Sequence, residues 1–270
     1  MELEIARADP AGNITIFVLN PPESKNERDA AARLLMADPD LAAEQVGFAY
    51  PPAAPGGHWR LEMASGEFCG NASRSFALLI TAQTGLSGIH TLTVKTSGIT
   101  QPVPVHIDTK AQTAEIEIPA PAKETEIAFN GRKFPVCIFE GITHVIAENM
   151  PPDEEMVRQL IRITGEQCAA ENIRPPDALG VLFYDSQKRF MEPVVWTRLT
   201  DQLVRESSCG SGSAALGAWV MRGINETETD IELAQPGGCL TVRVIKKAGK
   251  IIRLAISGKV TLGKVTRRSY

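Results

Sequence analysis

Two cysteines of this chain stand in closely similar surroundings. One opens the run CGNASRSFALLI at Cys69 and the other opens CGSGSAALGAWV at Cys209. Small and apolar residues suited to a helix follow each of them, so each cysteine is predicted to stand just before a helix N-terminus. The unpaired N–H groups and partial positive charge there favour a thiolate over a thiol and bind a carboxylate well.

Two such helix starts predict proton removal from a carbon next to a carboxylate. One thiolate would take the proton on one face of that carbon, and the second thiol would return a proton on the other face. Gly70 and Gly210 would let the backbone approach the ligand closely. The substrate expected is a free α-amino acid or a close relative. No cofactor is expected, because no PLP lysine, metal motif or flavin motif is evident.

The two motifs belong to an internal repeat. Cys69 and Cys209 are 209 − 69 = 140 residues apart, and Gly98 and Gly238 have the same separation, 238 − 98 = 140. We expect an α+β fold of two pseudo-symmetric halves, each with strands surrounding one central helix. The first half would be residues 1–120, with the tail 260–270 returning to it, and the second half residues 121–270.

Hydrophobic periodicity places further elements between these landmarks. Residues 120–130 are expected to form the crossover between the halves and residues 51–57 a loop. Besides the helices after the two cysteines, helices are expected at 27–37 and 153–167. Strands are expected at 14–19, 45–50, 58–63, 91–96, 103–107, 133–140, 143–147, 179–184, 190–196, 231–233, 240–245 and 251–256.

Composition narrows the function classes. A net charge of −4 argues against a nucleic-acid partner, which usually requires a basic surface. No apolar run approaches the roughly 18 residues of a membrane span, and MELEIARADP does not resemble a secretory signal. A soluble, cytoplasmic protein without a membrane partner is expected.

The odd number of cysteines and the scattered histidines argue against a disulfide framework and a zinc site. Cys137, Cys168 and Cys239 are expected to be inert, packed side chains.

At these residues the chain resembles the diaminopimelate epimerase superfamily of cofactor-independent, two-thiol racemases and epimerases. EFCGNASRSFA is similar to the family's first motif M-C-G-N-G-x-R-C-x-A, and SSCGSGSAA to its second, A-C-G-S/T-G-x-x-A. Shorter matches occur at Asn13, Gln45 and His144. The resemblance implies two pseudo-symmetric halves, each a β-barrel-like sheet around a central helix, with the site in the cleft between them.

The resemblance also assigns roles to residues. It implies that Cys69 is the base toward the L enantiomer and Cys209 toward the D enantiomer. The substrate-binding residues it suggests are Asn13, Gln45, Gly70, Asn71, His144, Gly210 and Ser211. The polar residues that hold the distal end of diaminopimelate are replaced here, at Met63, Ile142 and Leu179-Gly180. Burying a second zwitterionic group without those partners is costly, which argues against diaminopimelate as the substrate.

The sequence is more similar still to the histidine racemases that serve metallophore biosynthesis. The shared segments are EQVGF at 44–48, EFCGNA at 67–72, ESSCGSG at 206–212 and QPGG at 235–238. Histidine is therefore the leading substrate. Glu44 and Glu206 are expected to receive the substrate ammonium or an imidazole N–H.

Several alternatives stay open at this point. Diaminopimelate epimerase and proline or hydroxyproline racemase share the cysteine motifs, whereas the related phenazine-biosynthesis isomerases lack the paired thiols. A silent amino-acid-binding module is disfavoured because binding alone needs no thiol. Nothing in the sequence decides the oligomeric state, so a homodimer is left open.

Overall fold

The computed structural model describes residues 1–198 and 201–270. It forms two compact units, one of Met1–Glu117 with Ile256–Tyr270 and one of Ile118–Ala255. The return to the first unit lies inside β16 (Lys250–Lys259). The segment expected to be a crossover is instead largely a strand, β8 (Lys123–Phe129), which pairs with a strand of the second unit. Its alternating burial is that of a strand with one face on the core of the second unit.

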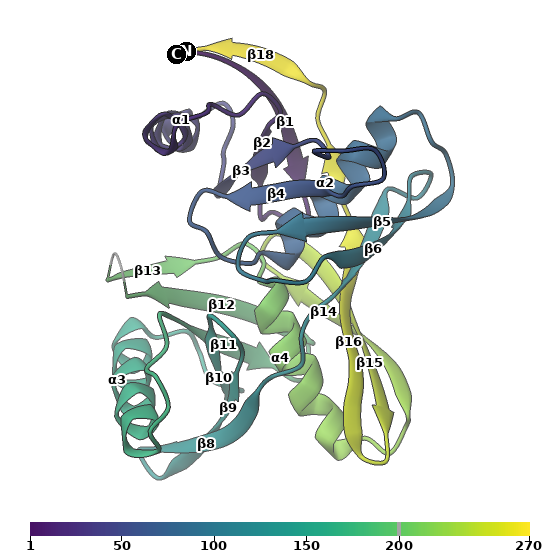
Figure 1. The fold of residues 1–270 in the computed structure, drawn as a ribbon. Coiled ribbons are helices and arrows are strands. Elements are labelled where there is room, and N and C mark those ends of the chain that lie inside the picture. Colours follow the sequence, from purple (N-terminus) through teal and green to yellow (C-terminus); the bar gives the residue numbers. More distant parts are fainter. Residues whose placement is uncertain (199–200) are drawn as a thin grey trace. The chain divides into compact units, whose positions relative to one another are not determined.

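The first unit is built on two parallel crossovers (Figure 1). Its elements are β1 (Glu2–Asp9), β2 (Thr15–Val18), α1 (Lys25–Ala37), β3 (Gln45–Tyr50), β4 (Trp59–Met63), α2 (Gly70–Gln83), β5 (Ile89–Thr96), β6 (Val103–Asp108) and β7 (Thr113–Glu117). Strands β2 and β3 are parallel and are joined through α1, and β4 and β5 are parallel and are joined through α2. The pairs β1–β2, β3–β4, β5–β6 and β6–β7 are antiparallel. From the C-terminal segment, β17 (Thr261–Leu262) and β18 (Thr266–Ser269) pair with β1.

The second unit repeats this succession. Its elements are β8, β9 (Arg132–Ile138), β10 (Thr143–Glu148), α3 (Glu154–Ala170), β11 (Ala178–Asp185), β12 (Phe190–Thr197), β13 (Gln202–Arg205), α4 (Gly210–Val220), a short 3-10 helix (Met221–Gly223), β14 (Glu228–Gln235) and β15 (Gly238–Lys247). Strands β10 and β11 are parallel and are joined through α3, and β12 and β14 are parallel with α4 between them. The pairs β9–β10, β11–β12 and β14–β15 are antiparallel. The predicted α+β, pseudo-symmetric fold is confirmed.

The two helices that begin after the cysteines are each enclosed by their own unit's sheet. Every residue of α2 from Gly70 to Thr81 is buried, and α2 contacts β1, β5, β6 and β7. Helix α4 is buried over most of its length and contacts β10, β11 and β15. At Gly217 a side chain would collide with Val242 of β15, so the missing Cβ sets how closely α4 approaches that strand. A helix that is apolar all round requires such surroundings.

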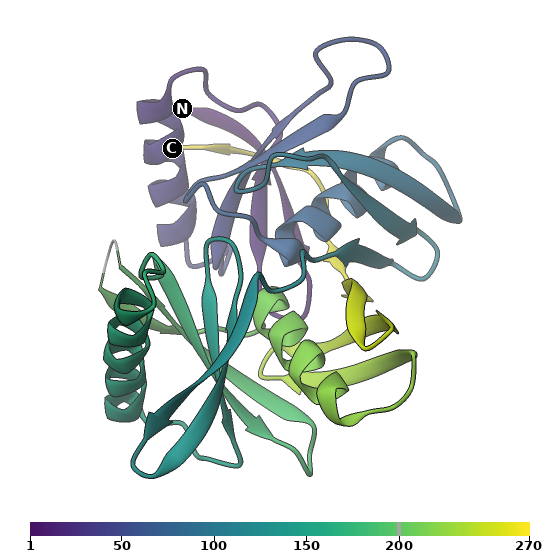
Figure 2. The same ribbon diagram turned by 60° about the horizontal axis from the view of Figure 1, so that its bottom comes forward.

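The other two helices are amphipathic and lie on the outer face of the sheet in their unit (Figure 2). Helix α1 begins with a capping box between Ser24 and Glu27, and Asp153 caps α3 by accepting from the N–H of Met156 at 2.6 Å. The buried side of α3 carries Met156, Val157 and Leu160 at helical spacing. These caps and stripes explain why both helices were predictable from the sequence.

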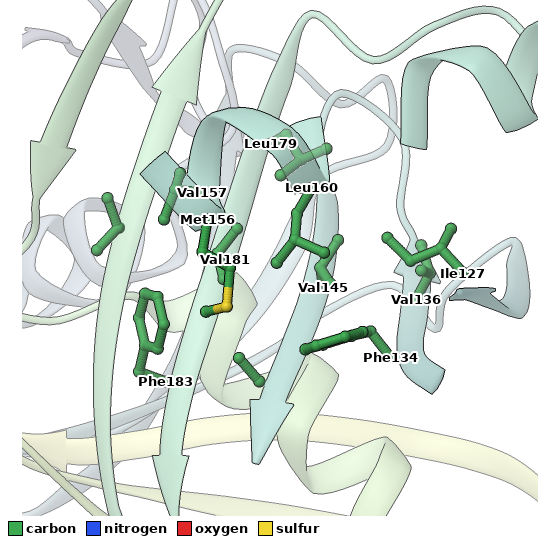
Figure 3. Close-up of a cluster of buried hydrophobic side chains, with 12 residues drawn as sticks. Ile127, Phe134, Val136, Val145, Met156, Val157, Leu160, Leu179, Val181 and Phe183 are labelled. Atoms are coloured by element: carbon green, nitrogen blue, oxygen red, sulfur yellow. The ribbon is translucent and has the colours of Figure 1, made fainter. Parts of the chain in front are cut away.

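A hydrophobic cluster joins α3 to the sheet of the second unit (Figure 3). Its side chains come from α3, from β8 and β9, and from β10, β11 and β12: Ile127, Phe134, Val136, Val145, Ala147, Met156, Val157, Leu160, Leu179, Val181, Phe183 and Val194. Complete burial of one such aliphatic side chain contributes roughly 1.5–3 kcal/mol to the free energy of folding.

Among the described residues, no helix combines the length and the apolar character that crossing a membrane would require.

Candidate active site

Cys69 is the N-cap residue of α2. Its backbone is extended, with φ −120° and ψ 111°, and its sulfur accepts a hydrogen bond from the Ala72 N–H at 3.4 Å. Its carbonyl accepts from the N–H of Ser73 at 2.9 Å. The cysteine therefore replaces the oxygen side chain that usually caps a helix, and this fixes its sulfur at the positive end of the helix dipole.

Three residues predicted for substrate binding surround Cys69. Gln45, at the start of β3, donates from Nε2 to the Cys69 sulfur at 3.4 Å and to Asn13 Oδ1 at 2.5 Å. Asn13 in turn donates to a Glu44 carboxylate oxygen at 2.9 Å. Asn13 and Gln45 meet because they lie at the adjacent starts of the parallel strands β2 and β3. The structure thus links Glu44, Asn13, Gln45 and Cys69 through hydrogen bonds.

The backbone before Cys69 is supported by the turn at Gly98. Ser97 donates its hydroxyl to the Glu67 carbonyl at 3.0 Å. Gly98 has φ +78°, and a Cβ there would collide with the backbone of Phe68. Glycine is needed on both counts, for the left-handed conformation and for the close approach. The repeated glycine noticed in the sequence therefore holds the chain just upstream of the thiol.

Cys209 caps α4 in the same way. Its φ of −122° and ψ of 112° nearly equal those of Cys69, its sulfur accepts from the Gly212 N–H at 3.3 Å, and its carbonyl accepts from the N–H of Ser213 at 2.9 Å. The Ser211 hydroxyl lies 3.5 Å from the sulfur. Gly70 and Asn71 begin α2 as Gly210 and Ser211 begin α4, so the two units present equivalent helix starts.

His144 reaches this second helix start from β10. Its Nε2 lies 2.9 Å from the Ser211 hydroxyl, and its side chain is fully buried. Burial lowers the pKa of His144 to about 3, so the ring is neutral near pH 7. Gly180 is its partner across the β10–β11 pair, and a Cβ at that position would come within 2.5 Å of His144 Nδ1. A glycine inside a strand was the available signal for this close approach.

Gln235 is a site residue that sequence reasoning did not single out. It is buried at the end of β14, accepts a hydrogen bond from the Cys209 N–H at 2.8 Å and donates to Ser213 Oγ at 3.0 Å. The following turn adds a bond from the Gly237 N–H to the Ser207 carbonyl at 2.8 Å. The QPGG segment therefore fixes the backbone of Cys209, a role that the motif alone does not reveal.

The ionisation of Cys209 differs from our expectation. We expected the helix start to favour its thiolate, but burial, followed by the negative charge of Glu206, raises the pKa of this thiol well above its ordinary value. The hydrogen bonds from the Ser211 hydroxyl and the Gly212 N–H lower the pKa of Cys209, but their effect is smaller than that of burial and Glu206. Glu206 is itself hydrogen-bonded to the thiol. Desolvation wins because only a few per cent of the Cys209 surface is exposed.

The remaining cysteines differ in their surroundings. Cys137 and Cys168 are buried, as expected for packed side chains, and burial raises the pKa of Cys137 to about 12. Cys239 is exposed, so the expectation of a packed side chain is wrong there, because it lies at the solvent side of the β14–β15 turn. Across residues 1–198 and 201–270, no group of three or more His, Cys, Asp or Glu side chains is gathered as a metal ion would require.

Known structures share this fold. A phenazine biosynthesis protein of the PhzF family from Bacillus anthracis is 13% identical, each chain covers 100% of the other, and the TM-score is 0.72. A hydroxyproline epimerase from Agrobacterium vitis is 12% identical with a TM-score of 0.64, over 98% of this chain and 92% of that one. At these identities the likeness concerns the fold, which is that of a class including isomerases and epimerases.

Sequence comparison identifies the family. Residues 2–265 match the family described as the histidine racemase CntK N-terminal domain. A histidine racemase of Fusobacterium nucleatum is 30% identical over 243 residues, covering 88% of each chain. One from Staphylococcus aureus is 26% identical over 264 residues, covering 96% of this chain and 94% of the relative. The chain therefore belongs to the histidine racemase CntK family, and it is an isomerase, an amino-acid racemase.

Proposed function

We propose that this racemase interconverts L- and D-histidine without a cofactor, using Cys69 and Cys209 as the two proton-transfer groups. The observation that supports this most directly is the equivalence of the two helix starts. Each unit places one thiol at an N-cap, with φ and ψ agreeing within two degrees. A duplicated fold that keeps a cysteine in the same cap in both copies is what a two-thiol reaction needs.

In the proposed reaction, one proton leaves the α-carbon and another proton is added to its opposite face. The Cys69 thiolate takes the α-proton of the L enantiomer, and the electron pair of the broken C–H bond delocalises into the carboxylate. The Cys209 thiol then donates its proton to the opposite face of the α-carbon, which leaves the D enantiomer, a Cys69 thiol and a Cys209 thiolate. Backbone N–H groups at the helix starts, at Gly70-Asn71 and Gly210-Ser211, would hold the carboxylate as negative charge develops on it.

Histidine is proposed as the substrate for two reasons. The relatives described above carry that activity in their names, and the carboxylates of Glu44 and Glu206 lie next to the hydrogen-bonded groups around the two thiols. Either carboxylate would accept from the substrate ammonium or from an imidazole N–H, and Asn13 and Gln45 would complete the walls, while the buried His144 would act through Ser211. Use of D-histidine in metallophore biosynthesis is a prediction that rests on the family resemblance.

The test is a screen of single amino acids. The protein is incubated with L-histidine, L-proline, trans-4-hydroxy-L-proline and a diaminopimelate isomer, and products are separated by chiral chromatography. We expect D-histidine to form fastest, with or without added PLP or chelator. Cys69→Ala and Cys209→Ala should each reduce the rate by at least about 10²-fold, the usual contribution of an acid or base. The exposed Cys239→Ala is the matched control and should retain the rate.

Three outcomes would contradict the proposal. Faster turnover of proline or diaminopimelate would reject histidine as the substrate. Near-normal racemisation by either thiol variant would reject the two-thiol mechanism. Histidine binding without any racemisation would favour a silent binding module.

A further inference from the structure

The hydroxyl of Ser97 connects the two ends of the loop that leads to Cys69. Its oxygen accepts a hydrogen bond from the Met63 N–H at 2.9 Å and donates one to the Glu67 carbonyl at 3.0 Å. Met63 is the last residue of β4, and Glu67 lies two residues before Cys69. Because β4 and β5 are parallel neighbours, both strands end at the same edge of the sheet, and this brings Ser97, the residue after β5, to the loop.

The loop between these two contacts is exposed to solvent. Residues 64–67 are all exposed, and Gly66 has φ +82°. Exposed loops open locally at a low free-energy cost. The helix cap does not compensate for this, because the sulfur of Cys69 is a weaker hydrogen-bond acceptor than the oxygen of the usual capping residues. The position of this thiol therefore depends on how the chain before α2 is held.

The second unit holds the chain before its thiol at the equivalent place. The Gly237 N–H donates to the Ser207 carbonyl at 2.8 Å, and Ser207 lies two residues before Cys209. The offset of 140 residues relates Ser97 to Gly237 and also Glu67 to Ser207. The donor is a side chain in the first unit and a backbone N–H in the second. A contact that is present in both units although its donor differs indicates that the geometry it maintains is needed at both thiols.

We propose that Ser97 is a positioning residue for racemisation, whose two hydrogen bonds hold the loop before α2 and thereby keep the Cys69 sulfur in the orientation that proton transfer requires. This inference rests on the proposed two-thiol function. Ser97 acts through the backbone of the loop rather than by contact with the substrate. Misplacement of a catalytic group by about 1 Å can lower a rate by about 10²-fold, so loss of the hydroxyl should reduce kcat.

The first experiment separates kcat from KM. The wild type, Ser97→Ala and Ser97→Thr are compared with the amino acid that the screen shows to be turned over fastest. Ser97→Ala should lower kcat at least about tenfold and change KM by less than about threefold. KM should change little because the Ser73 and Thr96 hydroxyls, 3.2 Å apart, still connect α2 to β5. Ser97→Thr keeps the hydroxyl and should retain most of kcat.

The control is Ser87→Ala, at an exposed serine beyond the other end of α2, which should change neither kcat nor KM. A purely structural role of Ser97 would lower the stability of Ser97→Ala and leave the kcat of its folded fraction unchanged.

The second experiment is amide hydrogen exchange, which needs no substrate. In the wild type the Met63 N–H should exchange slowly. Ser97→Ala should accelerate its exchange by roughly tenfold, as expected for the loss of ordinary hydrogen bonds, whereas Ser97→Thr should keep it protected. The Gly212 N–H at the start of α4 is the internal control and should not change.

A kcat of Ser97→Ala within about twofold of the wild type, or equal losses in Ser97→Ala and Ser97→Thr, would overturn the inference. A raised KM with unchanged kcat would also reject it and would assign Ser97 to substrate binding. If Ser97→Ala does not fold, the wild type and Ser97→Thr decide: exchange of the Met63 N–H as fast as that of the exposed Ser65 N–H would overturn the inference. Absence of racemisation with every amino acid would instead reject the proposed function, while the exchange rates would still show whether Ser97 holds the loop.

Discussion

His144 Nε2 lies 2.9 Å from the Ser211 hydroxyl oxygen, while His144 Nδ1 is buried with no hydrogen-bond partner. A neutral imidazole with its proton on Nε2 donates to Ser211 and leaves only a bare acceptor nitrogen unsatisfied. The Ser211 hydroxyl can then direct its own hydrogen toward the Cys209 sulfur, 3.5 Å away. His144 therefore determines the orientation of a group in contact with the thiol, although its ring belongs to the interior of the second unit.

Gly180→Ala should displace His144. The added Cβ would come within 2.5 Å of Nδ1, and overpacking of this kind costs roughly 1–3 kcal/mol of unfolding free energy. Urea unfolding measures the loss. Gly165→Ala in α3 is the control, because nothing lies within 4 Å of its Cβ and alanine favours a helix by up to about 1 kcal/mol. Equal stabilities of the two variants would show that the ring is free to move.

The buried His144 should make stability depend on pH. Its pKa is about 3 in the folded chain and about 6.5 when unfolded, so the unfolded state binds more protons and stability falls as pH drops from about 6.5 toward 3. Between pH 7 and pH 5 the wild type should lose about 2 kcal/mol more unfolding free energy than His144→Gln. Urea titrations at both pH values test this, and parallel losses in the two proteins would contradict it.

Gln235→Leu should weaken the support of Cys209. The substitution leaves the Cys209 N–H without its acceptor and removes the donor to Ser213, which costs roughly 1–3 kcal/mol of unfolding free energy for a buried group. We also expect at least about a tenfold fall in racemisation rate, since misplacement of a catalytic group is costly.

The control for this prediction is Gln187→Leu, at an exposed glutamine of the same unit, which should change neither quantity. If Gln235→Leu lost stability but kept its full racemisation rate, the glutamine would have a structural role only.

Early isotope incorporation should reveal one thiol per face. When L-histidine is converted in D₂O and the reaction is stopped early, the D product should carry deuterium at the α-carbon, because its new bond comes from the opposite thiol. Recovered L-histidine should stay largely protiated. NMR of the separated enantiomers measures both. Comparable early labelling of substrate and product would instead indicate a single group that serves both faces.

Much of this protein could be predicted from local sequence signals. The 140-residue offset, the small residues after Cys69 and Cys209, and the caps and apolar stripes of α1 and α3 depend on contacts within one element, so they are visible in the chain itself. They were enough to predict two repeated halves, two buried central helices and the thiols at their starts. Strands β7 and β13 were missed because their short, partly charged sequences form strands only when neighbouring strands pair with them, and the longer β1 was missed because charged residues interrupt its apolar ones.

Only the tertiary structure decided the electrostatics of the site. The sequence predicts a thiolate-favouring helix start at both cysteines, since the helix dipole is a local property. Desolvation and charge are not local: burial, followed by the negative charge of Glu206, raises the pKa of Cys209, which the helix start by itself would lower. Likewise, Gln235 reaches Cys209 and Gly180 makes room for His144 only because separate strands meet there. Burial depends on what surrounds a group from every side, and a linear pattern does not contain that information.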